Sequence, residues 1–96
     1  MTGTHLLMSE QQIEDRLLAQ EEFLKKVQEE RVKQNLKWGW QSHDGPKYYI
    51  ILMEEIGELA RGILEHRKEN TTEEMVHSAA VLCAMYEQHV NDRSLS

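Results

Sequence analysis

Apolar residues recur every three or four positions along most of the chain, a period typical of amphipathic helices, and strand-forming residues nowhere alternate with polar ones over a useful length. The pattern predicts three helices, running from about Glu10 to Lys37, from about Pro46 to Lys68 and from about Thr72 to Val90. Ser9 followed by Gln12 fits a capping box at the start of the first helix. Asp44 and Pro46 fit the start of the second helix.

Two polar stretches, SHDGP at 42–46 and KENTT at 68–72, are the predicted breaks. Because short connections favour antiparallel neighbours, we expect an all-α, antiparallel helical bundle of three main helices, forming one domain over residues 1–96. Residues 1–8 are expected to be flexible and 91–96 to form a tail. The first helix has only a thin apolar stripe, made by Ile13, Leu17, Leu24 and Val27. Oligomerisation to a homodimer or homotetramer would complete such a bundle, and a three-helix monomer is the alternative.

The second predicted helix carries acid on its apolar side. On a helical wheel Glu55 falls inside the apolar arc, between Ile51 and Leu59, and Glu58 lies at the edge of that arc. Gly62 lies between the two glutamates in angle, one turn further on, and leaves space above them. This placement is unusual, because an ionised carboxylate in a core is costly unless it is paired or binds a cation.

Three explanations for Glu55 are open at this point. The carboxylate pairs with a basic residue of the first helix such as Arg31, or desolvation keeps it protonated. Alternatively it binds a divalent metal together with Glu58, since side chains at i and i+3 share one helix face.

The third predicted helix is apolar nearly all the way round, which indicates burial on two sides. Glu74 and His77 lie within it, again at i and i+3, and bundles build metal sites from inward Glu pairs and Glu-x-x-His pairs. Two simpler interpretations compete. Thr71 and Glu74 also fit a capping box, and a single histidine on an apolar face is usually a hydrogen-bonded core residue.

Composition narrows the classes of function. The formal net charge of −6 argues against binding a nucleic acid polymer, although it leaves room for a nucleotide whose phosphates come with a metal. No apolar run approaches the length of a membrane span, and the N-terminus lacks the features of a signal peptide. Cys83 is the only cysteine, so neither an internal disulfide nor a thiolate-rich zinc site is expected. The default location is the cytoplasm, without membrane contact.

Several of these residues also stand in a familiar order. The stretch EEIGE at 54–58, followed by EEMVH at 73–77, resembles the E-E-x-x-E … E-x-x-D pattern of the MazG-like, all-α nucleoside triphosphate pyrophosphatases. A Lys-Trp-Gly at 37–39 and a Gln-x-His at 41–43 are similar to those of the small MazG-like branch. The resemblance covers about residues 27–90.

The resemblance implies a reaction and a site. Such enzymes cleave nucleoside triphosphates, including deoxynucleotides, between the α and β phosphates in nucleotide-pool clean-up. Carboxylates hold Mg²⁺, with Mn²⁺ as the alternative, and the metal lowers the pKa of the attacking water. Glu55, Glu58 and Glu74 would be metal ligands, with Glu54 orienting the water. The implied nucleotide pocket contains Lys37, Trp38, Gln41 and His43. Trp38 and Trp40 fit interface packing equally well.

Two departures from the pattern bear on activity. His77 occupies the fourth ligand position, where the family pattern has Asp, and imidazole is a poor Mg²⁺ ligand. The sequence also lacks the C-terminal basic segment by which larger relatives grip phosphate. Arg93, or Lys33 or Arg31 from a partner subunit, would have to replace that segment. The alternative is therefore a catalytically weak or inactive helical module that binds a nucleotide or a metal.

Overall fold

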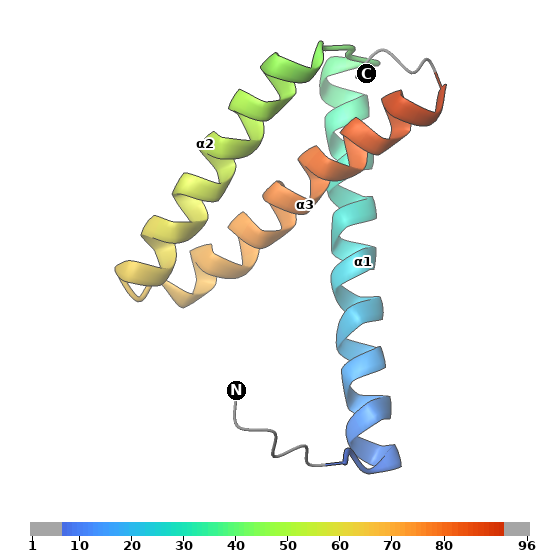
Figure 1. The fold of residues 1–96 in the computed structure, drawn as a ribbon, viewed down its shortest axis with the longest axis vertical. Helices are drawn as coiled ribbons and strands as arrows, with labels where there is room; N and C mark the ends of the chain where they lie inside the picture. The colour runs from blue at the N-terminus through green and yellow to red at the C-terminus, as the bar shows by residue number, and fades with distance from the viewer. Residues whose placement is uncertain (1–6, 92–96) are drawn as a thin grey trace.

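The computed structural model describes residues 7–91, with Glu69 described by its backbone alone. It contains three helices, α1 (Glu10–Trp38), α2 (Gly45–Leu64) and α3 (Lys68–Asn91), and no strand within the described residues (Figure 1). The all-α prediction is confirmed. Most of the expected flexible N-terminus and C-terminal tail, and Arg93, lie outside the described residues.

Both predicted helix starts are confirmed by their capping bonds. The Gln12 backbone N–H donates to Ser9 Oγ at 3.1 Å, and the Ser9 N–H donates to Gln12 Oε1 at 2.8 Å, which completes the capping box of α1. The Asp44 carboxylate accepts from the Lys47 N–H at 2.9 Å at the start of α2. Gly39 ends α1 with φ 71°, a left-handed conformation that glycine adopts without steric cost.

The predicted break between the second and third helices is wrong. The chain turns at Glu65–Arg67, and KENTT at 68–72 is the first part of α3. The turn is a Schellman motif, in which the Arg67 N–H donates to the Gly62 carbonyl at 2.9 Å and the His66 N–H donates to the Ile63 carbonyl at 3.2 Å. His66 has φ 57° and occupies the left-handed position that glycine usually takes, so no glycine or proline marks this turn.

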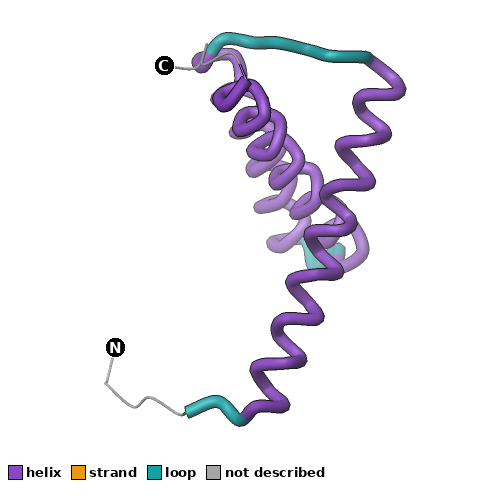
Figure 2. Tube along the Cα trace, turned by 90° about the vertical axis from the view of Figure 1, so that its right-hand side faces the viewer, coloured by secondary structure: helices purple, strands orange, loops and turns teal. Residues whose placement is uncertain are grey.

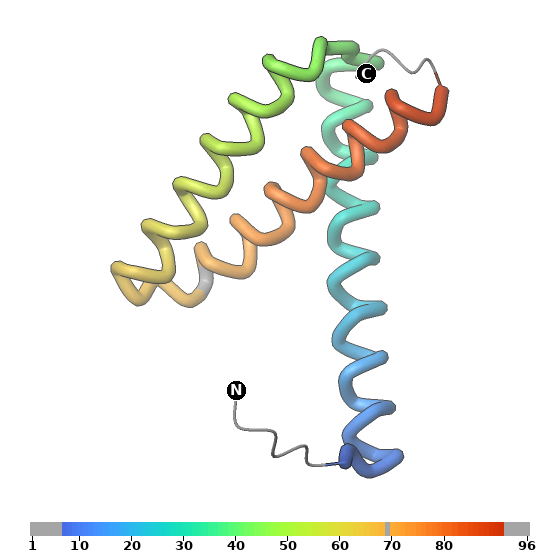
Figure 3. Tube along the Cα trace, in the orientation of Figure 1, coloured from blue at the N-terminus to red at the C-terminus, as the bar shows by residue number. Residues whose placement is uncertain are grey.

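Helix α3 packs against both of the other helices. It runs antiparallel beside α2 and also packs against α1, whereas α1 and α2 do not pack against each other (Figures 1 and 3). The view turned by 90° shows the N-terminal part of α1 extending beyond the α2–α3 pair (Figure 2). The molecule is accordingly elongated, with extents of 44 × 32 × 29 Å.

The core is small and lies between α1 and α3. Val27, Val76 and Ala80 are buried together. Three further residues pack against them, namely Phe23, Ala79 and Cys83. As expected, α3 packs on two sides, against α2 and against α1. Some large apolar side chains of this helix remain exposed in the single chain, namely Met75, Leu82 and Tyr86.

The helical wheel predicted that Gly62 leaves open space above Glu55 and Glu58, and this prediction is wrong. A Cβ at this position would lie 3.3 Å from Thr71 Oγ1, so the first turn of α3 fills that space. Glycine here lets α2 and α3 approach closely beside the turn that joins them. No helix among the described residues is long and apolar enough to cross a membrane.

Candidate functional site

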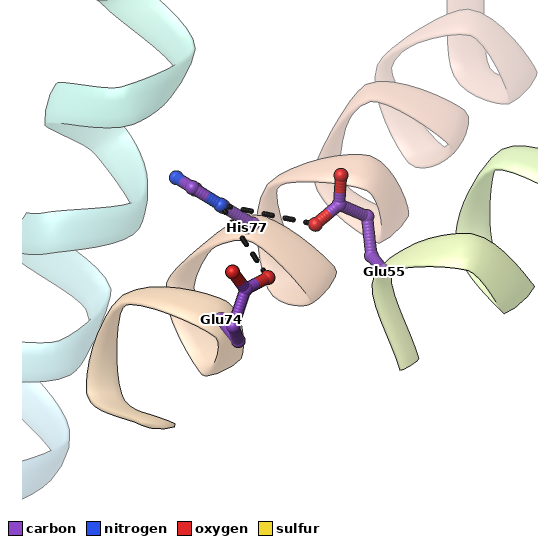
Figure 4. A group of neighbouring side chains, drawn as sticks. All are labelled: Glu55, Glu74 and His77. Carbon is purple, nitrogen blue, oxygen red and sulfur yellow. Dashed lines mark ion pairs between the residues drawn. The ribbon is translucent and has the colours of Figure 1, made fainter. Parts of the chain in front are cut away.

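Glu55, Glu74 and His77 meet between α2 and α3. Each offers one atom with metal-ligand chemistry, and these three atoms lie within 4.8 Å of one another. The His77 Nδ1 atom lies 3.8 Å from Glu55 Oε2 and 3.7 Å from Glu74 Oε2. Figure 4 shows Glu55 reaching from α2 and both carboxylates turned toward the imidazole. We call these three residues the Glu-Glu-His cluster.

The cluster contains buried oxygens that the protein does not satisfy. Glu55 Oε2 and Glu74 Oε2 are both inaccessible and accept no hydrogen bond from any described residue. Burial is the main cause that raises the pKa of Glu55, the charge of Glu58 adds to it, and His77 acts in the opposite direction. Buried oxygen atoms that accept no hydrogen bond fit a bound cation, and the donor set of two carboxylates and an imidazole suits a divalent metal.

The capping-box interpretation of Glu74 is wrong, because α3 begins at Lys68 and Glu74 lies in its second turn. The Thr71 hydroxyl instead donates to the Arg67 carbonyl at 2.9 Å. Glu74 is thereby left to face Glu55 and His77.

The other two predicted acids lie outside the cluster. Glu58 is exposed and lines a small cavity together with Glu74. The negative charge of Glu58 contributes to the raised pKa of Glu55. Glu54 is exposed and belongs to neither arrangement.

A cavity of about 210 Å³ adjoins the cluster, between the C-terminal end of α1, the connection to α2, α2 itself, and α3. Glu55 forms part of its wall. Four of the five residues proposed from sequence to bind substrate also line it, namely Arg31, Trp38, Gln41 and His43. Lys37 does not line the cavity. Its Nζ lies 4.8 Å from the ring centroid of Trp38, in a cation–π arrangement.

Arg31 pairs with Glu87 and not with Glu55. Its Nε donates to Glu87 Oε2 at 2.8 Å and its Nη2 donates to Oε1 at 3.1 Å, a bidentate contact between α1 and α3. This bonding lowers the pKa of Glu87 and raises that of Arg31. Pairing with Arg31 is therefore not the explanation of the carboxylate at Glu55.

Gln88 fastens the connection between α1 and α2 to α3. Its side chain is fully buried, accepts from the His43 backbone N–H at 3.0 Å and donates to the His43 carbonyl at 2.6 Å. The His43 ring in turn packs edge-on against Tyr48, with ring centroids 5.1 Å apart. Sequence reasoning did not identify Glu87 or Gln88. The signal available was a polar pair interrupting the apolar surface near the end of the third helix.

Comparison with protein-family models, with curated proteins and with solved structures found no match to this chain.

Proposed function

We propose that the protein is a metal-dependent nucleoside triphosphate pyrophosphohydrolase, which cleaves (deoxy)nucleoside triphosphates between the α and β phosphates. The observation that carries this proposal is the Glu-Glu-His cluster, whose Glu55 lines a cavity together with aromatic, amide and cationic groups. The order of acidic and aromatic residues along the sequence supports the same reaction. Such an enzyme would clear unwanted nucleotides from the cytoplasmic pool.

The chain's own groups have distinct parts in this proposal. Glu55, Glu74 and His77 would hold the metal, with Glu58 completing the ligand set if its side chain turns inward. A bound divalent cation would neutralise phosphate charge and lower the pKa of the attacking water. Because one donor is an imidazole, we expect Mn²⁺ to be at least as effective as Mg²⁺.

The cavity would take the nucleoside. Trp38 offers an aromatic face for stacking on the base, and Gln41 and His43 offer hydrogen-bonding groups beside it. Arg31 carries positive charge at the same wall. Water would attack the α phosphorus, the bond from that phosphorus to the bridging oxygen would break, and the electron pair would leave on pyrophosphate. A nucleoside monophosphate is the other product, and the proton of the water is released to solvent.

The reaction is tested by incubating the pure protein with a panel of (d)NTPs and either Mg²⁺ or Mn²⁺, and resolving the products. We expect a monophosphate and pyrophosphate. Glu55→Gln should abolish turnover while helicity is retained. A diphosphate and inorganic phosphate, or no turnover with either cation, would contradict the proposal.

Metal binding is tested separately by thermal unfolding. A cation that binds only the folded state stabilises it by about 2.7 kcal/mol at 100 times its Kd. We expect Mn²⁺ to raise the unfolding temperature of the natural chain and not that of Glu74→Gln. Glu73→Gln is the matched control, because the adjacent carboxylate is exposed and lies outside the cluster. Equal responses from both variants would mean that the cluster does not hold the cation.

A catalytically weak or inactive module that binds a nucleotide or metal is the second candidate. It is favoured by His77 standing where the resemblance implies Asp, and by Glu58 lying outside the cluster. Metal-dependent stabilisation without turnover would select this alternative. In either case we propose that the chain works as a homodimer or homotetramer.

A further inference from the structure

A second cavity adjoins the Glu-Glu-His cluster, apart from the first cavity, whose walls include Trp38, His43 and Tyr48 and which we call the aromatic cavity. It has a volume of about 160 Å³ and is lined by Arg61 of α2, Arg67 of the turn, Asn70, Glu58 and Glu74. We call it the arginine groove. Glu74 belongs both to this groove and to the cluster, whereas Glu55 lines the aromatic cavity. The cluster therefore stands between a cavity with aromatic walls and one with two guanidinium groups.

The two arginines are available to an anion. Arg61 is exposed and forms no ion pair with any described side chain, and among the described side chains Arg67 pairs with the exposed Glu65 alone, at 3.3 Å. Exposed ion pairs of this kind contribute little to stability, so an anionic ligand can replace Glu65 as the partner of Arg67. A planar guanidinium binds phosphate oxygens through two parallel hydrogen bonds, which makes arginine the better residue for this role.

A competing basic surface lies on the α1 side of the cluster. There Lys26 and Lys33 share a wider hollow with His77. Three carboxylates stand among these lysines, from Glu29, Glu30 and Glu73, so negative charge outnumbers positive charge. The arginine groove contains two acids for two arginines, and one of these acids, Glu74, is a cluster member whose charge a bound metal would neutralise. The observations therefore favour the arginine groove as the site for an anion.

We propose that the arginine groove binds the β and γ phosphates of a nucleoside triphosphate. The nucleoside would lie in the aromatic cavity, the α phosphate at the cluster, and the two leaving phosphates between Arg61 and Arg67. When the bond between the α phosphorus and the bridging oxygen breaks, the electron pair passes to that oxygen and the guanidinium groups donate to the pyrophosphate formed. The identity of the substrate rests on the proposed function, whereas pyrophosphate binding itself does not.

The test uses the full chain and isothermal titration with the preformed Mn²⁺ complex of inorganic pyrophosphate. We expect Arg61→Gln and Arg67→Gln each to weaken binding about tenfold, as expected for loss of a charge-assisted hydrogen bond, and the double variant to weaken it further. Lys26→Gln is the matched control for each single arginine variant, with the same change of charge on the other side of the cluster, and should bind within about twofold of the natural chain. Arg61→Lys should recover part of the affinity.

Kinetics on a nucleoside triphosphate then separate the two proposals. Arginine-dependent pyrophosphate binding without any turnover would support the groove and remove the proposed reaction. Turnover with unchanged pyrophosphate affinity in the double arginine variant would overturn the groove and leave the reaction. The proposal that the groove binds pyrophosphate would also be overturned if the lysine variant lost affinity and the arginine variants did not. The same holds if the natural chain does not bind pyrophosphate. Circular dichroism shows whether each variant is folded, and the single variants serve if the double variant is not.

Discussion

Glu55 is a carboxylate placed where the protein gives it few partners. One of its oxygens is buried without a hydrogen bond, and a second carboxylate, Glu74, lies across from it. Burial raises the pKa of Glu55 above its ordinary value of 4.5. A raised pKa means that the folded state binds the proton more tightly than the unfolded state. Glu55 therefore makes the metal-free protein progressively less stable as the pH rises through its folded pKa.

We expect Glu55→Gln to be more stable than the natural chain at pH 7 in the presence of a chelator. The gain should shrink as the pH falls toward 4.5, because the natural carboxyl then becomes neutral as well. Thermal unfolding of both proteins across this pH range measures the difference. A variant that is less stable at pH 7 would show that Glu55 makes a structural bond. With excess Mn²⁺ at neutral pH, the natural chain should instead be the more stable of the two proteins, because only its Glu55 carboxylate can bind the cation.

The unusual position of Glu55 could be read from the sequence, but its neighbours could not. A helical wheel fixes which residues share a face, and it placed Glu55 on the apolar side of its helix. The distance from Glu55 to His77 depends on how far α2 and α3 slide along each other, which is decided by packing at contacts such as Gly62 with Thr71. For the same reason the pairing of Arg31 with Glu87 had no signal in the sequence.

At the scale of elements, local capping signals predicted helix ends well wherever they were present. The starts at Ser9 and Asp44 were correct, because a side-chain oxygen at each satisfies a free backbone N–H. The break at KENTT was wrong, since residues of modest helix propensity there are held in α3. The actual turn depends on His66 in a left-handed conformation, which only a minority of histidines adopt.

The connection between α1 and α2 depends on one side chain of α3. The Gln88 amide satisfies both the N–H and the carbonyl of His43, so the wall of the aromatic cavity is fixed to α3. Replacing Gln88 by Leu leaves both backbone groups without these bonds. We expect a loss of about 2–4 kcal/mol in the free energy of unfolding, measured with urea.

Hydrogen exchange checks the same contact directly. The His43 amide should exchange slowly in the natural chain and much faster in Gln88→Leu, while the amides within α1 change little. A His43 amide that exchanges freely in the natural chain would contradict this account. Gln88→Glu is a useful companion, because a carboxylate can accept from the N–H but cannot donate to the carbonyl.

The whole molecule is more open than a compact monomer of its size. The radius of gyration is 16.4 Å, whereas a compact domain of this length has about 12.5 Å. The accessible surface is 7862 Å², which exceeds the expectation for a folded monomer of this mass by about 2,100 Å². An obligate interface covers about 1,000–2,500 Å² on each partner. We therefore expect a second copy of the chain to cover part of this surface.

We expect such a copy to pack on the apolar stripe of α1. Val27 of this stripe is buried against α3, and the stripe continues toward the N-terminus through Leu24, Leu17 and Ile13, which are about half exposed. Because this part of α1 extends beyond the α2–α3 pair, no other described element covers it (Figure 2). The sequence predicted that this face packs, and within one chain only its C-terminal end does.

We expect the chain to sediment as a homodimer or larger, at two or more times the monomer mass of 11.3 kDa. Leu17→Asp should shift the equilibrium toward monomer and lower the thermal stability, because it places a charge in the proposed interface. Leu18→Asp is the matched control, because it makes the same chemical change outside the stripe. Leu18 is adjacent to Leu17 in sequence and points about 100° away from it around the helix. Sedimentation equilibrium over a range of concentrations measures both. A natural chain that remains monomeric at high concentration would contradict the interface, and equal dissociation by the two variants would show that the interface is not confined to the apolar stripe.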